Sequence, residues 1–361
     1  MKDLLLSNKN IEVPTTYTDR LVYLDEQSQC IKPIPDYYTP AILKELYEAL
    51  TKTRAMDTKA VNLQRTGLMS TYPSSRGQEA IGVGIGHAML ATDVFCPYYR
   101  DQGAFLLRNV PIADIYSLWG GDERGNLFPN NNQDLPICVP IACQYLHATG
   151  VAFAIKHRQE NRAVVTTGGD GSTSKGDFYE AINLAGAWNL PVVFVINNNQ
   201  WAISVPRTGQ SNSQTISQKA IAAGFRGIQV DGNDVIAVRE SVSQALEKAR
   251  NGGGPTLIEA VSYRLCDHTT ADDATRYQPS DEVKQAWERE PVIRLANYLE
   301  SLGEWSKQQE AELQEKVKAA IEEDTEKYLN RIPQDKNSMF TYLYQNMPDV
   351  LLDQIDELGE Q

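Results

Sequence analysis

The sequence Gly169-Asp170-Gly171-Ser172-Thr173-Ser174-Lys175-Gly176 decides the fold of this chain. It follows residues 163–167, a β-branched run that predicts a buried parallel strand. Apolar residues then recur at helical spacing over residues 178–188, and residues 191–196 form a second buried run. The order strand, turn, helix, strand predicts a βαβ unit. Backbone N–H groups of its glycine turn are expected to bind an anion at the start of the helix.

A second polar stretch, Asn197-Asn198-Asn199-Gln200-Trp201, follows the second predicted strand. Asp170 and Asn199 lie 29 positions apart and emerge at the carboxyl ends of neighbouring strands, so the two side chains can share one ion. Carboxylate and amide oxygens are hard donors that suit Mg²⁺ bound to phosphate oxygens. A lone Gly-Asp-Gly is usually an ordinary turn, but the combination with the asparagine run is specific. The sequence therefore predicts a site for a diphosphate and a metal ion.

These two motifs resemble those of thiamine diphosphate enzymes. Residues 169–180 are similar to the α subunit of the decarboxylating component of 2-oxoacid dehydrogenase complexes. Other segments match that family in the same order, namely residues 77–80, 98–101, 202–206, 230–234 and 255–259. The resemblance covers roughly residues 20 to 345, nearly the whole chain.

The resemblance implies an α/β fold with a doubly wound, mainly parallel sheet and helices on both faces. Within it we expect an irregular N-terminal arm over residues 1–40, a cofactor domain over residues 41–280 and a C-terminal helical segment over residues 281–361. Hydrophobic spacing predicts helices at residues 38–60, 144–157, 235–250, 291–301 and 306–330, and strands at residues 228–231 and 256–263.

Carried over residue by residue, the family pattern makes Asp170, Asn199 and the carbonyl group of Trp201 the ligands of Mg²⁺. The backbone N–H groups of Gly171 and Ser172 then contact the diphosphate of thiamine diphosphate.

Four further residues match positions that contact the cofactor in this family. Tyr99 and Arg100 match a pair that reaches the diphosphate, although Arg100 also fits a surface ion pair with Asp101. His268 matches a loop histidine that reaches the phosphates and is expected to assist acyl transfer, although a polar loop also carries solvent-exposed histidines. Ile141 matches the position whose backbone touches the aminopyrimidine ring, but a core isoleucine would look identical.

The chain has room for one cofactor-binding half, whereas thiamine enzymes need two. The resemblance implies that a β subunit supplies the second half in an α₂β₂ heterotetramer. The expected reaction is oxidative decarboxylation of a 2-oxoacid, with acyl transfer to the lipoyl group of the acyltransferase component. Residues 124–150 favour a pyruvate dehydrogenase α subunit, whereas residues 340–348 are similar to branched-chain enzymes, which remain the alternative.

Two positions depart from the family pattern. Arg124 stands near a place where many members carry a histidine. Thr71 occupies a position that is often a large aromatic residue, which predicts more room beside the thiazolium ring.

Two alternatives belong to other classes of protein. A non-catalytic assembly subunit would be expected to have lost its metal-site residues, which are present here. A nicotinamide-dependent enzyme would carry a strand-borne glycine fingerprint. Residues 82–86, Gly-Val-Gly-Ile-Gly, follow no β-branched strand, so we expect them to serve close helix packing.

Composition narrows the possible partners and the compartment. The 47 acidic and 34 basic residues give a net charge of −13, which disfavours nucleic acid or an anionic membrane as a partner. The five cysteines lack Cys-x-x-Cys spacing and are expected to be small buried side chains in a reducing compartment. The apolar run in residues 1–7 is too short for a signal peptide, so we expect a cytoplasmic protein.

Overall fold

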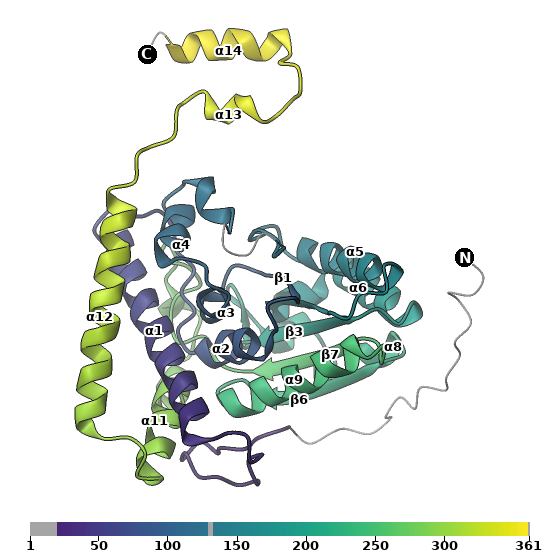
Figure 1. The fold of residues 1–361 in the computed structure, drawn as a ribbon, viewed down its shortest axis with the longest axis vertical. Coiled ribbons are helices and arrows are strands. Elements are labelled where there is room, and N and C mark those ends of the chain that lie inside the picture. Colours follow the sequence, from purple (N-terminus) through teal and green to yellow (C-terminus); the bar gives the residue numbers. More distant parts are fainter. Residues whose placement is uncertain (1–19, 129–132, 360–361) are drawn as a thin grey trace.

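A five-stranded parallel sheet forms the centre of the computed structural model, which describes residues 20–128 and 133–359. The strands are β1 (Val94–Cys96), β2 (Val164–Gly169), β3 (Val192–Asn198), β6 (Arg226–Asp231) and β7 (Thr256–Val261), in the spatial order β1-β2-β3-β7-β6. All four neighbouring pairs run parallel. The α/β fold with a mainly parallel sheet is therefore confirmed (Figure 1).

The sheet separates two hydrophobic cores, because alternate side chains of each strand point to opposite faces. On one face, Val192, Phe194 and Ile196 pack with α5 (Cys143–His157) and α6 (Gly176–Ala187). On the other face, the core includes α1 (Pro40–Arg65), α2 (Glu79–Ala88) and α9 (Val235–Arg250). Figure 1 shows α5 and α6 on the opposite side of the sheet from α9.

The predicted βαβ unit consists of β2, a 3₁₀ turn at Asp170–Ser174, helix α6 and β3. Gly169 of β2 lies directly beside Asn197 of β3 in the parallel register. The polar residues that follow each strand therefore meet at one edge of the sheet.

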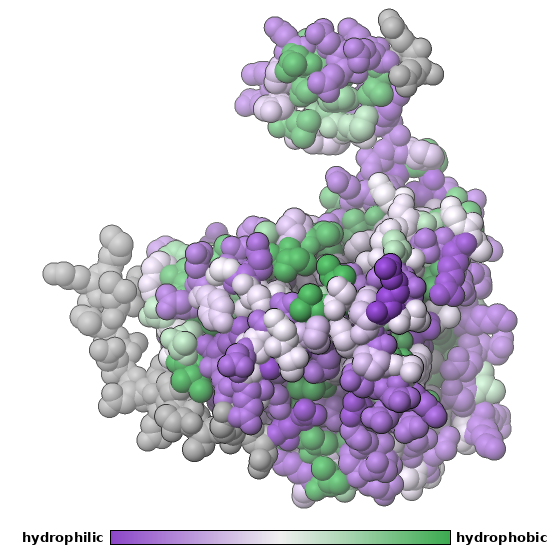
Figure 2. All heavy atoms as spheres, turned by 180° about the vertical axis from the view of Figure 1, so that it is seen from behind, coloured by the Kyte–Doolittle hydropathy of each residue, from purple (hydrophilic) through white to green (hydrophobic). Residues whose placement is uncertain are grey.

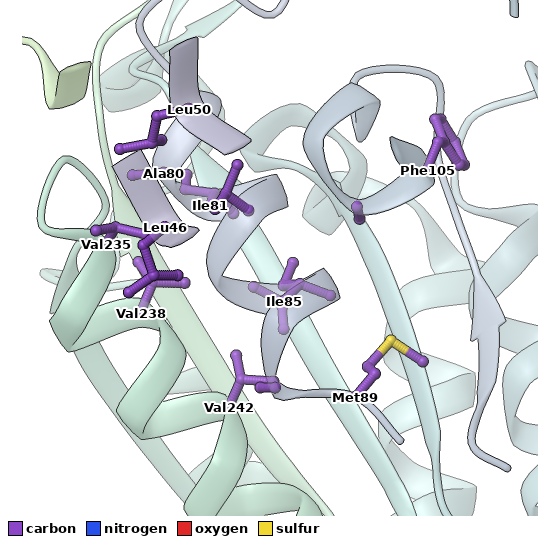
Figure 3. Packing of buried hydrophobic residues seen from close by; sticks show 14 of the residues in the cluster. Leu46, Leu50, Ala80, Ile81, Ile85, Met89, Phe105, Val235, Val238 and Val242 are labelled. Carbon is purple, nitrogen blue, oxygen red and sulfur yellow. The ribbon is translucent and has the colours of Figure 1, made fainter. Parts of the chain in front are cut away.

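The glycines of residues 82–86 lie inside α2, where they permit close approach of neighbouring helices, as predicted. A Cβ on Gly84 would lie 2.6 Å from the Val238 side chain of α9. A Cβ on Gly86 would lie 2.8 Å from Leu107, the last residue of α3 (Gln102–Leu107). Figure 3 shows Val238 and neighbouring side chains of α9 close to α2.

The C-terminal part is helical. Its helices are α10 (Ser280–Glu288), α11 (Pro291–Ser301), α12 (Lys307–Leu329), α13 (Ser338–Thr341) and α14 (Asp349–Gly359). Helices α11 and α12 pack against α1. Helices α13 and α14 project away from the sheet domain (Figure 1). Figure 2 shows apolar surface on this projecting part, where Tyr342, Leu343 and Val350 are exposed.

The remaining elements are short connections. They are α4 (Ile112–Trp119), η1 (Glu123–Asn126), β4 (Trp201–Ala202), β5 (Val205–Pro206), α7 (Arg207–Gln210), α8 (Lys219–Ala222) and η3 (Ala274–Arg276). No helix in the described ranges is both long and apolar enough to cross a membrane.

Three sequence predictions need comment. The helix expected at residues 38–60 begins at Pro40, because Thr39 caps it, and continues to Arg65. The expectation that the cysteines are buried is wrong in part: Cys96 is buried, Cys30 is exposed and the other three are intermediate, because they lie in loops or at a helix end. The predictions for residues 1–19 and for part of the polar loop before residue 133 lie outside the described residues.

Candidate active site

A cavity of about 290 Å³ lies where β2 and β3 end. Every site residue predicted from the sequence lines it, namely Tyr99, Arg100, Ile141, Asp170, Gly171, Ser172, Asn199, Trp201 and His268. These residues come from five separate segments of the chain, so the fold brings together what the sequence keeps apart.

Asp170 supplies a buried carboxylate at the end of β2. Its side chain is 2% exposed, and its Oδ2 atom has no hydrogen-bond partner among the described residues. Burial raises the pKa of this carboxyl group from 3.8 to about 7, although backbone N–H groups and Arg264 act in the opposite direction. A buried anionic oxygen without a partner is unfavourable unless a cation occupies the adjoining space.

Asn199 presents a side-chain amide whose orientation is fixed at both ends. Its Nδ2 group donates to Gln78 Oε1 at 2.8 Å, and its Oδ1 atom accepts from the backbone N–H of Trp201 at 3.1 Å. The asparagine oxygen, the Asp170 carboxylate and a backbone carbonyl form an oxygen donor set that fits Mg²⁺. Within residues 20–128 and 133–359, no three His, Cys, Asp or Glu side chains converge as the protein ligands of a transition metal would.

The turn after β2 is shaped by two close approaches. A Cβ on Gly171 would lie 2.5 Å from the side chain of Ala202, so glycine brings the two cavity loops together. A Cβ on Gly168 would lie 2.0 Å from the hydroxyl oxygen of Tyr145. That hydroxyl bonds to Ser172 Oγ at 2.6 Å and thereby fixes the turn. Tyr145 lies on α5 in a run of small residues, and sequence reasoning missed it.

Arg100 is buried and faces the cavity, so the interpretation as a surface ion pair with Asp101 is wrong. Its guanidinium group donates to the Ser74 carbonyl at 2.5 Å, to the His268 carbonyl, and to His268 Nδ1 at 3.0 Å. Asp101 points elsewhere and accepts from Thr167 Oγ1 and from the backbone N–H of Tyr98.

His268 lies in the cavity as a neutral N–H donor. A guanidinium group has only donors, so His268 Nδ1 must accept the bond from Arg100 and the ring proton sits on Nε2. Burial, followed by the positive charges of Arg100 and Arg264, lowers the pKa of His268 to about 3. At neutral pH this side chain can therefore donate a hydrogen bond to an anion but carries no positive charge.

Arg264 is a fully buried cation that sequence reasoning missed. It donates to Ile203 O at 3.0 Å and to Tyr277 Oη at 2.6 Å, and so connects the loop after Asn199 with the loop of His268. Within the described part of the chain, neither Arg264 nor Arg100 forms an ion pair with a carboxylate. Buried cations normally pair with anions, so Arg100 in the cavity lining, with Arg264 bonded to the lining residue Ile203, fits a negatively charged ligand.

Apolar side chains form another part of the cavity lining. Ile141 has 44% of its surface exposed there, and Val139, Pro140 and Ile203 also line the cavity. The interpretation of Ile141 as a core residue is therefore wrong. A cavity lined by both a cationic side chain and apolar side chains fits a ligand that joins a diphosphate to an apolar ring system.

Comparison with known proteins decides the family. The model of the dehydrogenase E1 component family matches residues 47–334. The chain belongs to the dehydrogenase E1 component family.

Similar curated proteins include the pyruvate dehydrogenase E1 component subunit alpha of Staphylococcus aureus strain Mu50, which is 39% identical over 341 residues. The protein of the same name from Staphylococcus epidermidis strain RP62A is 38% identical over 341 residues. Each alignment covers 94% of this chain and 92% of the relative.

The two departures from the E1 pattern lie outside the cavity lining. Arg124 pairs with Asp122 and donates to the carbonyl of Ile332, which anchors the start of the C-terminal extension. Thr71 is exposed, so its small size does not enlarge the cavity of this chain. The expectation of more room beside the cofactor ring therefore receives no support from the cavity lining.

Proposed function

We propose that this chain is the α subunit of a pyruvate dehydrogenase E1 component that binds thiamine diphosphate with Mg²⁺. The observation that carries the proposal is the unpartnered, buried Oδ2 atom of Asp170 in a cavity whose lining also contains the buried guanidinium group of Arg100, which has no carboxylate partner in the described structure. A metal ion satisfies the carboxylate, and a diphosphate satisfies the Arg100 cation. The similar proteins named pyruvate dehydrogenase E1 component subunit alpha support the assignment.

In this proposal, different residues hold the metal ion and the diphosphate. Asp170, Asn199 and the Trp201 carbonyl hold Mg²⁺, while the backbone N–H groups of Gly171 and Ser172 contact the diphosphate. Bound thiamine diphosphate supplies the carbon nucleophile and the electron sink that allow a 2-oxoacid to lose CO₂. The protein holds the cofactor in position and supplies the charged groups around it.

The remaining predicted residues orient the two ends of the cofactor. Arg100 neutralises diphosphate charge beside Tyr99, and Ile141 supports the aminopyrimidine ring. His268 donates its Nε2–H group to an oxygen of the phosphates or of the reacting acyl group. A neutral imidazole does this without forming an ion pair that would have to break during acyl transfer.

The second half of the active site is proposed to come from a β subunit in an α₂β₂ heterotetramer. In the described part of the chain, the proposed metal ligands follow β2 and β3 at one edge of the sheet, and the exposed apolar side chains of α13 and α14 provide surface for a partner to cover. The acyl group then passes to the lipoyl group of the acyltransferase component. An assembly subunit without catalysis is disfavoured, because every residue of the proposed metal site lines the cavity.

Calorimetric titration of thiamine diphosphate and Mg²⁺ into the chain co-expressed with its β subunit tests the proposal. Decarboxylation of pyruvate and of 3-methyl-2-oxobutanoate is followed in the same preparation. Metal-dependent binding with faster turnover of pyruvate is expected. Faster turnover of 3-methyl-2-oxobutanoate would assign the enzyme to branched-chain 2-oxoacids instead of pyruvate. Absence of cofactor binding would leave an assembly role for the chain.

A further inference from the structure

The segment Gly77-Gln78-Glu79-Ala80 contains one residue that reaches the proposed metal site without lining the cavity. Gly77 has φ +85°, and a Cβ there would lie 2.6 Å from Tyr263 O, so glycine is required for the turn. Glu79 accepts from the backbone N–H of Gly77 at 2.9 Å and pairs with Arg54. These contacts place Gln78 at the N-terminus of α2 with its side chain directed to β3.

Gln78 contacts both asparagines that lie on one face of the β3 terminus. Its Oε1 atom accepts from Asn197 Nδ2 and from Asn199 Nδ2, each at 2.8 Å. Asn197 and Asn199 are two positions apart, so their side chains share a face, whereas Asn198 points away and bonds to Glu259. One glutamine oxygen therefore holds two amide groups.

The direction of each bond in this network is determined. Asn197 Oδ1 accepts from Ser262 Oγ at 2.9 Å, which leaves its Nδ2 group as the donor to Gln78. Rotating the glutamine amide by half a turn would place its NH₂ group against two other NH₂ groups. The buried Nε2 atom of Gln78 has no partner in the described structure, and the side chain, 1% exposed, keeps this orientation nonetheless.

We propose that Gln78 is the positioning residue that keeps the oxygen of the Asn199 amide, and not its nitrogen, directed to the Mg²⁺ ion. An asparagine side chain can present either end, and only the oxygen binds a metal cation. With Nδ2 held by Gln78, the Oδ1 atom is left for the Trp201 N–H and the metal. The proposal rests on the proposed function, because it assumes that Asn199 is a ligand.

The test measures the Mg²⁺ concentration that half-saturates thiamine diphosphate binding to the complex with the β subunit. Gln78→Met keeps the length of the side chain and removes the acceptor, so the required Mg²⁺ concentration should rise about 10- to 100-fold, as for other residues that orient metal ligands. Gln78→Glu restores an acceptor oxygen and should keep the requirement within about threefold of the unmodified protein, well below that range.

Gln102→Met is the matched control. Gln102 is also buried and hydrogen-bonded, to Tyr72 Oη and to Pro73 O, but it has no contact with Asn199. Its substitution should lower the thermal midpoint without changing the Mg²⁺ requirement.

Three results would overturn the inference: an unchanged Mg²⁺ requirement in Gln78→Met, an equal rise in Gln102→Met, or a rise of tenfold or more in Gln78→Glu. The last result remains decisive if Gln78→Met does not fold. Failure of the unmodified complex to bind thiamine diphosphate in a Mg²⁺-dependent way would overturn the proposed function together with this inference. The two failures are therefore distinguishable.

Discussion

Replacing Asp170 by Asn should stabilise the metal-free protein at neutral pH while abolishing metal-dependent cofactor binding. The carboxyl pKa is 3.8 in an unfolded chain and about 7 in the folded protein, because burial disfavours the charged form. A raised folded-state pKa favours folding below pH 4, and this contribution is lost as the pH rises to about 7. The asparagine amide carries no charge and avoids that loss.

The magnitude follows from the two pKa values. Each pH unit between them corresponds to about 1.4 kcal/mol, so the ionised carboxylate destabilises the apoprotein by at most about 4 kcal/mol above pH 7. Rearrangement or water entry reduces this value. For 361 residues, an unfolding entropy of about 2.1 cal/mol/K per residue converts 4 kcal/mol into a thermal midpoint about 5 °C higher in Asp170→Asn.

The assay compares thermal unfolding of the unmodified protein and Asp170→Asn at pH 5 and at pH 8, with chelator present. The difference in thermal midpoint between the two proteins should widen from pH 5 to pH 8. Asp177→Asn, a partly exposed substitution of the same chemistry outside the cavity lining, should show no such gap. A gap that is equal at both pH values would refute the conclusion that Asp170 is a buried, uncompensated carboxylate. Normal cofactor affinity in Asp170→Asn would refute its role as a metal ligand.

Three further predictions concern other contacts. In the ligand-free chain, an NMR titration should show no ionisation of His268 between pH 5 and 8, because the pKa of that histidine is lowered to about 3. In the assembled enzyme, His268→Gln should keep more cofactor affinity than His268→Ala, since glutamine retains an N–H donor. Gly168→Ala should destabilise the protein by about 1–3 kcal/mol in urea unfolding through its clash with Tyr145, and adding Tyr145→Phe should recover only part of that loss, because the ring carbon Cζ and Ser172 Oγ still lie 2.8 Å from the added Cβ. Arg54→Met should cost about 3–5 kcal/mol by the same measurement, since it leaves the buried carboxylate of Glu79 without its cation.

Four of the five strands of the central sheet were predictable from local sequence, whereas the three-residue strand β1 (Val94–Cys96) was missed. Residues of β2 and β3 are mostly β-branched and are buried on both faces. The short glycine turn between β2 and α6 then favours a βαβ unit over other connections. The metal-site residues were predictable for the same reason, because Asp170 and Asn199 directly follow those strands. Hydrophobic spacing alone locates the ends of the strands and therefore the residues that follow them.

The residues that support the site were not predictable in this way. Arg264 follows β7 and looks like any charged residue after a strand, and Tyr145 looks like part of an amphipathic helix. Their roles depend on contacts with segments more than 25 positions away, such as the bond from Tyr145 to Ser172 and the bond from Arg264 to Ile203. Arg100 shows the same limit, because its neighbour Asp101 suggested a local ion pair and the fold separated the two side chains.

The unsatisfied groups of this molecule link its stability to its function. Within the described residues, Asp170 and Arg100 of the cavity lining and the buried Arg264, which bonds to the lining residue Ile203, have no ion-pair partner, and each uncompensated charge is unfavourable in the folded chain alone. A sequence selected only for stability would pair or remove such groups, as Asp170→Asn would. A ligand that supplies both a cation and a polyanion relieves all of them at once. The folded state should therefore gain stability in proportion to the logarithm of free ligand concentration above its dissociation constant. Mg²⁺ or diphosphate alone relieves only one sign of charge, so the two together should raise the thermal midpoint by more than the sum of their separate effects.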